Sequence, residues 1–348
     1  MTPFDLPTPV HLQQTDGGAS PLDGLPEWDF SALYAGEDDA KLADDLAWLD
    51  TETAKFRTDY ENQLGDKSAP ALAACVQRYE NIQTVMGRIM SFAGLRYYQN
   101  TTDADRAKFM SDMQERITEQ SANLVFFTLE MNRIEDARFD LLLAEDPDLA
   151  RYRPVLDRMR AMKPHQLSDE LEAFLHDQGV VGASAWNRLF DETMAGLTFE
   201  IDGEALPLEA TLNRLTDTDR SKRKAATHAL IEVFRANLPL FARITNTLAK
   251  EKEIEDRWRK LPTPQSGRHL ANHVEPEVVE ALRNAVVAAY PRLSHRYYAL
   301  KAKWLGMETM QVWDRNAPLP TADDRLVSWD EAKETVMTAY SGFDPRMA

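Results

Sequence analysis

The stretch LADDLAWLDTETAKFRTDY, residues 42–60, decides the fold class. Its apolar side chains recur at intervals of three, four or seven residues, with charged residues between them: Leu42, Leu46, Leu49, Phe56 and Tyr60. This spacing places the apolar side chains on one face of an α-helix, which turns once every ~3.6 residues. The stretch therefore predicts a long amphipathic helix with one face in a core.

Two further apolar stripes follow the same helical spacing. The first comprises Val76, Tyr79, Ile82, Met86 and Ile89. The second comprises Phe109, Met113, Ile117, Leu124 and Phe127. Each stripe predicts one more helix, and its methionine and aromatic side chains are assigned to the core. The chain is expected to be mainly α.

Helix-start signals recur later in the chain, with Ser or Asp at a cap position or Pro in the first turn. They occur at Asp146-Pro147, Ser168, Pro276, Ser328 and Asp344-Pro345. The helix opened by Pro276 is expected to run to Trp304 with a kink at Pro291. Residues 261–274 contain two prolines and a glycine, and a loop is predicted there.

One segment departs from the helical period. In LTFEIDGEAL, residues 197–206, Leu197, Phe199 and Ile201 alternate with polar residues. Asp202-Gly203 follows, and this pair accepts the positive φ angles of a type I′ turn. A β-hairpin is predicted, and we place a domain boundary just before it.

The balance of charge bears on the possible partners. The 348 residues include 57 acidic and 40 basic side chains, for a formal net charge of −17. Such a charge opposes binding to nucleic acid and to anionic lipid, so neither partner is expected. The basic cluster Lys222-Arg223-Lys224 is interpreted as a solvated helix face. No apolar run has the length needed to span a bilayer.

Cys75 is the single cysteine, so no disulfide can form within the chain. This fits a reducing compartment, and a cytoplasmic location is predicted. Cys75 is interpreted as a small buried residue of a helix. Residues 1–25 are rich in Pro and Gly and lack the basic start and apolar centre of a signal peptide. They are predicted to form a flexible lead-in.

His269 and His273 are the only histidines that stand four residues apart, the spacing of two zinc ligands on one helix face. A metallopeptidase needs Glu directly after the first of them, to act as general base on zinc-bound water, and Leu270 stands there instead. A structural or surface role is favoured for both, and for His165, His228 and His295 as well.

Other chemical signatures are absent from the sequence, which contains no dinucleotide-binding or phosphate-binding glycine loop and no Gly-x-Ser-x-Gly elbow. Two interpretations stay open for Trp313-Asp314-Arg315-Asn316: a functional loop, or a packed loop anchored by Trp313, which is favoured. No catalytic, cofactor-binding or metal-ligating residue is assigned.

Several segments, taken in order, resemble the oligoendopeptidase F family of thimet-type zinc metallopeptidases. They are Pro26 to Tyr34 (PEWDFSALY), Ser168 to Leu175, Phe199 to Glu204 (FEIDGE), Arg220 to Ala226 (RSKRKAA), Tyr290 to Leu293, Lys303 to Gly306 and Val312 to Asp314. No single segment is specific for the family, but the order and spacing of the segments together support the resemblance.

This resemblance implies a mostly helical clam shell around a deep cleft, of the zincin-type peptidase fold. In the family, zinc is held by two His of a His-Glu-x-x-His helix and by a Glu downstream, and the Glu within the motif activates water. The motif lies beyond the position where this chain ends. The resemblance thus implies an N-terminal helical domain at residues 26–195 and an incomplete peptidase domain at residues 196–348.

Two hypotheses follow. In the first, the chain is the N-terminal part of a cytosolic zinc endopeptidase that hydrolyses short peptides, and alone it is inactive and binds no zinc. The helix-start signal at Asp344-Pro345 supports this expectation, because a single turn of helix is unstable by itself. In the second, the chain is a complete, non-catalytic helical binding protein.

Overall fold

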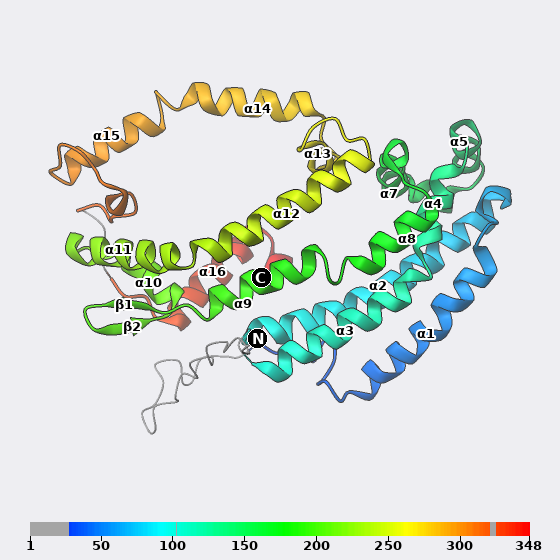
Figure 1. Cartoon of the computed structure of the whole chain (residues 1–348), viewed down its shortest axis with the longest axis horizontal. Helices are drawn as coiled ribbons and strands as arrows, with labels where there is room; N and C mark the ends of the chain where they lie inside the picture. The colour runs from blue at the N-terminus through cyan, green and yellow to red at the C-terminus, as the bar shows by residue number, and fades with distance from the viewer. Residues whose placement is uncertain (1–27, 102, 321–324) are drawn as a thin grey trace, which may run out of the picture. The chain divides into compact units, whose positions relative to one another are not determined.

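A computed structural model describes residues 28–101, 103–320 and 325–348. Within these ranges the chain is built of helices and one two-stranded antiparallel sheet (Figure 1). The prediction of a mainly α protein with one hairpin is confirmed. The predicted flexible lead-in, residues 1–25, lies outside the described residues.

The helices before the hairpin are α1 (Ala40–Tyr60), η1 (Leu64–Asp66), α2 (Ala69–Gln99), α3 (Ala104–Ala122), α4 (Val125–Arg133), α5 (Asp136–Glu145), α6 (Pro147–Arg151), α7 (Arg153–Arg160), η2 (Lys163–His165), α8 (Asp169–Gln178) and α9 (Ala183–Ala195). After the strands β1 (Phe199–Ile201) and β2 (Glu204–Leu206) come α10 (Leu208–Arg214), α11 (Arg220–Ala236), α12 (Leu238–Trp258), α13 (Ser266–Asn272), α14 (Pro276–Ala289), α15 (Ser294–Trp304), η3 (Val312–Asp314), α16 (Trp329–Phe343) and η4 (Pro345–Met347).

The chain divides into two compact units. The first contains the described residues up to 208 and residues 232–284, and the second contains the described residues of 209–231 and 285–348. The domain boundary predicted before the hairpin stays a prediction.

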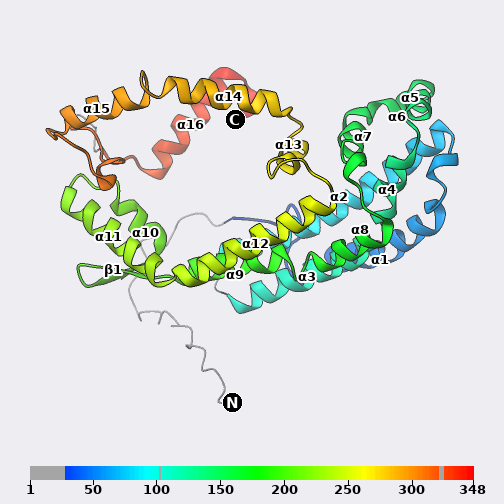
Figure 2. The same ribbon diagram turned by 45° about the horizontal axis from the view of Figure 1, so that its top comes forward.

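The core of the first unit lies among α1, α2 and the helices that follow them. Helices α1, α2 and α3 pack side by side (Figures 1 and 2). The largest fully buried side chains are aromatic, and the rings of Tyr79 and Phe127 stack with their centroids 4.1 Å apart. Burying one such ring contributes roughly 2–3 kcal/mol. The predicted stripe of α1 is confirmed, since Leu42, Leu46 and Phe56 are buried.

The stripe from Phe109 to Phe127 was predicted as one helix, and this is wrong. Helix α3 ends at Ala122 and α4 begins at Val125. At the break, the side-chain amide of Asn123 donates to Thr53 Oγ1 at 3.2 Å, which ties the turn to α1. A contact over seventy residues of sequence thus interrupts a helix that local spacing favours.

The chain does not merely kink at Pro291, as predicted, because the helix is interrupted there. The helix expected from Pro276 to Trp304 is two helices, α14 and α15, with a turn at residues 290–293. The loop predicted at residues 261–274 also needs correction, because it contains α13. That helix ends at His273, whose φ of 51° lies in the left-handed region.

The predicted cap positions are correct, but they are not all used in the same way. Asp146 accepts a hydrogen bond from the Leu149 amide at 2.9 Å, and Ser328 Oγ accepts one from the Glu331 amide at 3.2 Å. Ser168 precedes α8 without a side-chain cap bond. Glu172 in that helix instead reaches back and accepts from the Leu167 amide at 2.8 Å.

The hairpin has the predicted register and turn. Phe199 pairs with Leu206, and Asp202 and Gly203 have φ angles of 53° and 83°. Phe199 is fully buried, and its ring meets that of Phe234 edge to face at 5.8 Å. The hairpin therefore packs one face inward within the first unit.

No helix in the described part of the chain combines the length and the apolar character that crossing a membrane requires.

Two glycine substitutions test this account of the first unit. Gly203→Ala is expected to lower the free energy of unfolding by ~1 kcal/mol, because an L-residue is strained at a positive φ. Gly87→Ala lies in α2, where an added Cβ meets nothing within 4 Å, and it is expected to raise stability by up to ~1 kcal/mol. Urea unfolding followed by circular dichroism measures both. Equal effects of the two substitutions would contradict the assigned conformations.

Candidate functional site

The two histidines at the zinc-ligand spacing do not share a helix face. His269 lies in α13, whereas His273 stands beyond its end in a left-handed conformation. In residues 28–101, 103–320 and 325–348, no three His, Cys, Asp or Glu side chains form a group that could hold a metal ion. The described side chains therefore do not fit a catalytic zinc.

Cys75 is fully buried in α2. Burial raises the pKa of its thiol to about 12, because a thiolate loses its hydration there. The thiol is therefore protonated at neutral pH and is no nucleophile. The interpretation of Cys75 as a packing residue agrees with its place in the core.

The first unit contains an open groove of about 2300 Å³. It is lined by residues of α2, α3, α4, α8, α9, α12 and α13. Its lining is mainly apolar and includes Met86, Leu124, Leu171, Phe174 and Trp186. Phe174 is 59% exposed, so the groove presents an uncovered aromatic ring to a ligand. This groove is the candidate binding site of the chain.

The end of α12 is anchored at this groove by one ion pair. Arg259 donates two hydrogen bonds to the two carboxylate oxygens of Glu172 in α8, at 2.7 and 3.0 Å. Burial disfavours the ionised Glu172, yet the bonds from Arg259 and from the Leu167 amide outweigh it and lower the pKa of the carboxyl. His165 Nδ1 lies 2.9 Å from the Arg259 carbonyl oxygen beside this pair.

A second anchor joins α12 to the start of α9. Glu251 Oε1 accepts a hydrogen bond from the Ala183 amide at 3.1 Å, as a side-chain cap supplied by a distant helix. A Cβ on Gly182 would lie 2.6 Å from the same oxygen. Glycine at this position therefore lets Glu251 reach the helix end, and the two anchors hold α12 against α8 and α9.

A serine and a histidine meet in the groove. Ser121 Oγ lies 2.8 Å from His176 Nε2, and the two atoms lie 3.0 and 3.3 Å from the carbonyl oxygen of Thr118. The contact joins α3 to α8.

An acceptor without a partner lies in the same groove. Asn132 is 2% exposed, and its side-chain amide donates to Gln166 Oε1 at 2.9 Å. Its own Oδ1 has no hydrogen-bond partner among the residues that the structure describes. A buried acceptor without a donor costs stability, on the order of 1–3 kcal/mol.

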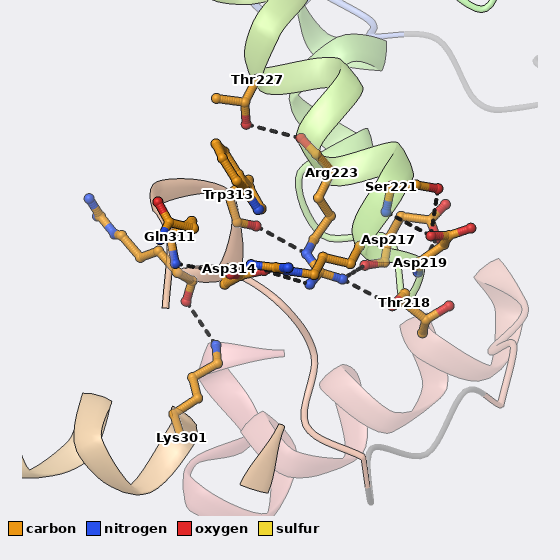
Figure 3. A network of polar contacts seen from close by, with 12 residues as sticks. Asp217, Thr218, Asp219, Ser221, Arg223, Thr227, Lys301, Gln311, Trp313 and Asp314 are labelled. Carbon is orange, nitrogen blue, oxygen red and sulfur yellow. Dashed lines mark hydrogen bonds and ion pairs between the residues drawn. The ribbon is translucent and has the colours of Figure 1, made fainter. Parts of the chain in front are cut away.

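The second unit contains a buried ionic network centred on Asp314 (Figure 3). The fully buried carboxylate of Asp314 accepts two hydrogen bonds from Arg220, both at 2.9 Å, and one from Arg223 at 3.0 Å. The Gln311 amide adds a fourth at 3.0 Å. These bonds lower the pKa of Asp314 to about 2, and the bonds from Arg220 have the largest effect. Burial acts in the opposite direction and raises the pKa.

The interpretation of Lys222-Arg223-Lys224 as a solvated helix face is wrong for Arg223, which is buried. Its side chain is 2% exposed and donates to the carbonyl oxygens of Trp313, Asp217 and Thr218. Lys222 and Lys224 are exposed, as a solvated face requires. Helical spacing could not show this, because the partner carboxylate lies ninety-one residues further along the sequence.

Comparison with known proteins gives this arrangement a context. A family model described as Oligopeptidase F matches residues 130–199. Group B oligopeptidase PepB of Streptococcus agalactiae serotype III (strain NEM316) is 23% identical over 317 residues, or 88% of this chain and 51% of that protein. Oligopeptidase PepF of Bacillus subtilis (strain 168) is 23% identical over 80% of this chain and 42% of that protein.

The predicted resemblance to the oligoendopeptidase F family is confirmed. The crystal structure of oligoendopeptidase-F from Enterococcus faecium has the same fold, with a TM-score of 0.72 at 21% identity, over 87% of this chain and 62% of that one. The chain spans about half the length of the curated relatives it matches.

Two segments that carry the oligoendopeptidase F resemblance meet in the Asp314 network. The segment from Arg220 to Ala226 supplies both guanidinium groups, and the segment from Val312 to Asp314 supplies the carboxylate. Lys301 adds a bond to the Arg315 carbonyl oxygen at 2.8 Å. Of the two interpretations of this loop, the packed loop is therefore favoured, with Asp314 rather than Trp313 as the main anchor.

Asp314→Asn tests the network. At neutral pH the substitution is expected to lower the free energy of unfolding by ~3 kcal/mol, because it leaves the buried Arg223 cation without its counter-ion. The folded-state pKa is depressed, so the native stabilisation is present above about pH 4 and is lost as pH falls towards about 2. The free energies of unfolding of the native protein and of Asp314→Asn, measured by urea unfolding, should therefore become more similar as pH falls from about 4 to about 2.

Asp330→Asn is the matched control, because Asp330 is exposed on α16 in the same unit. Its effect should stay within ~0.5 kcal/mol at every pH. If Asp314→Asn behaved like this control, the network would contribute nothing to stability.

Proposed function

We propose that this chain is the N-terminal part of a cytoplasmic, zinc-dependent oligoendopeptidase that hydrolyses peptide bonds in short peptides. The observation that carries the proposal is the ordered likeness to oligopeptidases over 80–88% of the chain, joined to the shared fold. Fold alone would not indicate an activity, but the relatives of similar sequence are named as peptidases.

The groove of the first unit supports a peptide as ligand. Its volume of about 2300 Å³ exceeds the ~300–1,000 Å³ of pockets for small molecules. It is open, so an extended chain can lie in it with both ends in solvent. Its apolar lining suits the side chains of a peptide.

The zinc chemistry is assigned to the part of the longer protein that this chain does not include. Bound zinc would polarise a peptide carbonyl and lower the pKa of a water molecule. Within residues 28–101, 103–320 and 325–348, no group of three His, Cys, Asp or Glu side chains is placed to hold it. The proposed work of this chain's residues is to bind and orient the peptide.

A net charge of −17 disfavours nucleic acid and anionic membranes as partners. Oligopeptides are proposed as substrates because the relatives of similar sequence are named as oligopeptidases. The alternative function, a complete non-catalytic helical binding protein, keeps the groove as a binding site and omits hydrolysis. The two candidates make opposite predictions for the gene and for activity.

The decisive experiment sequences the gene past the codon for Ala348 and assays the encoded protein on internally quenched peptides. A His-Glu-x-x-His motif is expected downstream, and the longer protein should cleave peptides in a reaction that a chelator stops and zinc restores. Replacing the Glu of that motif with Gln should abolish cleavage without loss of peptide binding.

The 348-residue chain is the control and should show no hydrolysis. Chelator-sensitive cleavage by this chain alone would contradict the assignment of the chemistry to another part of the protein. A longer protein that carries the motif and cleaves no peptide would refute the proposed function itself.

A further inference from the structure

The groove of the first unit differs in charge from the whole chain. Five basic and four acidic side chains line the groove, whereas the chain contains 40 basic and 57 acidic residues. Salt screens the field of exposed charges beyond ~8 Å, so a ligand in the groove responds mainly to the side chains around it. The lining therefore decides which charge a ligand should carry.

The acidic side chains of the lining already have partners within the first unit. They are Glu172, Glu251, Glu255 and Asp256. Arg259 donates hydrogen bonds to two of these carboxylates, Lys252 donates to a third and the Ala183 amide donates to the last. A cationic ligand would have to displace one of these bonds to reach a carboxylate.

Two basic side chains of the lining have no such partner. Arg243 on α12 and Arg268 on α13 are exposed, and among the described residues of the first unit no carboxylate lies within 4.0 Å of either guanidinium group. Each guanidinium offers a planar fork of N–H donors that matches the two oxygens of a carboxylate. The groove thus has free donors for an anionic ligand.

The two arginines lie too far apart to bind one carboxylate together. Arg243 and Arg259 are about 24 Å apart along α12, at a rise of ~1.5 Å per residue. Figures 1 and 2 show α13, which contains Arg268, beside the C-terminal end of α12. A Cβ on Gly267 would lie 3.6 Å from Leu261 Cδ1, just beyond that end. A ligand that meets both arginines therefore needs two separate carboxylates.

We propose that the groove selects extended peptides with two acidic side chains, one for Arg243 and one for Arg268. This inference rests on the proposed function and names the class of peptide that the groove prefers. An extended peptide advances ~3.3 Å per residue, so side chains seven positions apart span ~23 Å. The exposed ring of Phe174 in the same lining suits an apolar residue of the same peptide.

Calorimetric titration of the 348-residue chain with three ten-residue peptides tests the preference. The peptides are acetylated and amidated, so they carry no terminal charge, and their second and ninth residues are both Glu, both Gln or both Lys. The Glu peptide is expected to bind about tenfold more tightly than the Gln peptide, because each exposed ion pair contributes up to about fivefold in affinity. The Lys peptide should bind more weakly than the Gln peptide.

Substitutions in the chain identify the two contacts. Arg243→Gln and Arg268→Gln are each expected to weaken binding of the Glu peptide about threefold and to leave the Gln peptide unchanged. Arg158→Gln is the matched control, because Arg158 is exposed on α7 and does not line the groove, and it should change neither affinity. Circular dichroism confirms that all three variants fold.

A fourth peptide distinguishes acidic side chains from a chain terminus. The Gln peptide with a free C-terminal carboxylate is expected to bind at least threefold more weakly than the Glu peptide, since one carboxylate can meet only one of the two arginines. Equal affinity of these two peptides would overturn the assignment to side chains.

Four other results would overturn the charge preference: equal affinity for the Glu and Gln peptides, tighter binding of the Lys peptide, groove variants that behave like Arg158→Gln, or a folded chain that binds none of the peptides. The titration requires neither zinc nor hydrolysis. A longer protein that cleaves peptides while this chain shows no preference refutes the preference alone. A chain that prefers the Glu peptide, but whose longer form cleaves nothing, refutes the proposed function alone.

Discussion

The carboxylate of Asp314 is fully buried, and the guanidinium groups of Arg220 and Arg223 stabilise its negative charge. A buried carboxylate without partners would cost several kcal/mol, so the loop at residues 311–315 can pack only where α11 delivers Arg220 and Arg223 together. Their spacing of three residues on one helix face is what allows both to reach it. The order of the second unit follows from this requirement.

The first unit is organised by apolar packing, which is why the sequence predicts it well. The apolar stripes of α1 and α2 predict which helix faces are buried, and the Asp202-Gly203 pair predicts the turn of the hairpin. Two of the errors involve distant groups. Asn123 ends α3 through a bond to Thr53, and the burial of Arg223 depends on Asp314. Local spacing contains no information on such partners.

The candidate site was less predictable than the fold. The groove is lined by residues of seven helices, and α12 is held to α8 by Arg259 with Glu172 and to the start of α9 by Glu251. These are ordinary charged residues in an acidic chain, so their pairing could not be inferred from the sequence. The sequence alone shows that it contains no His-Glu-x-x-His motif, because such a motif has a fixed local spacing.

The function proposed for this chain is to bind a peptide and to leave the metal chemistry to another part of the protein. The zinc content of the purified 348-residue chain tests this division most directly. Elemental analysis after dialysis against dilute zinc is predicted to find far less zinc than protein, because the described side chains offer no group of ligands. An equimolar amount of tightly held zinc would contradict the account and would return His269 and His273 to the role of metal ligands.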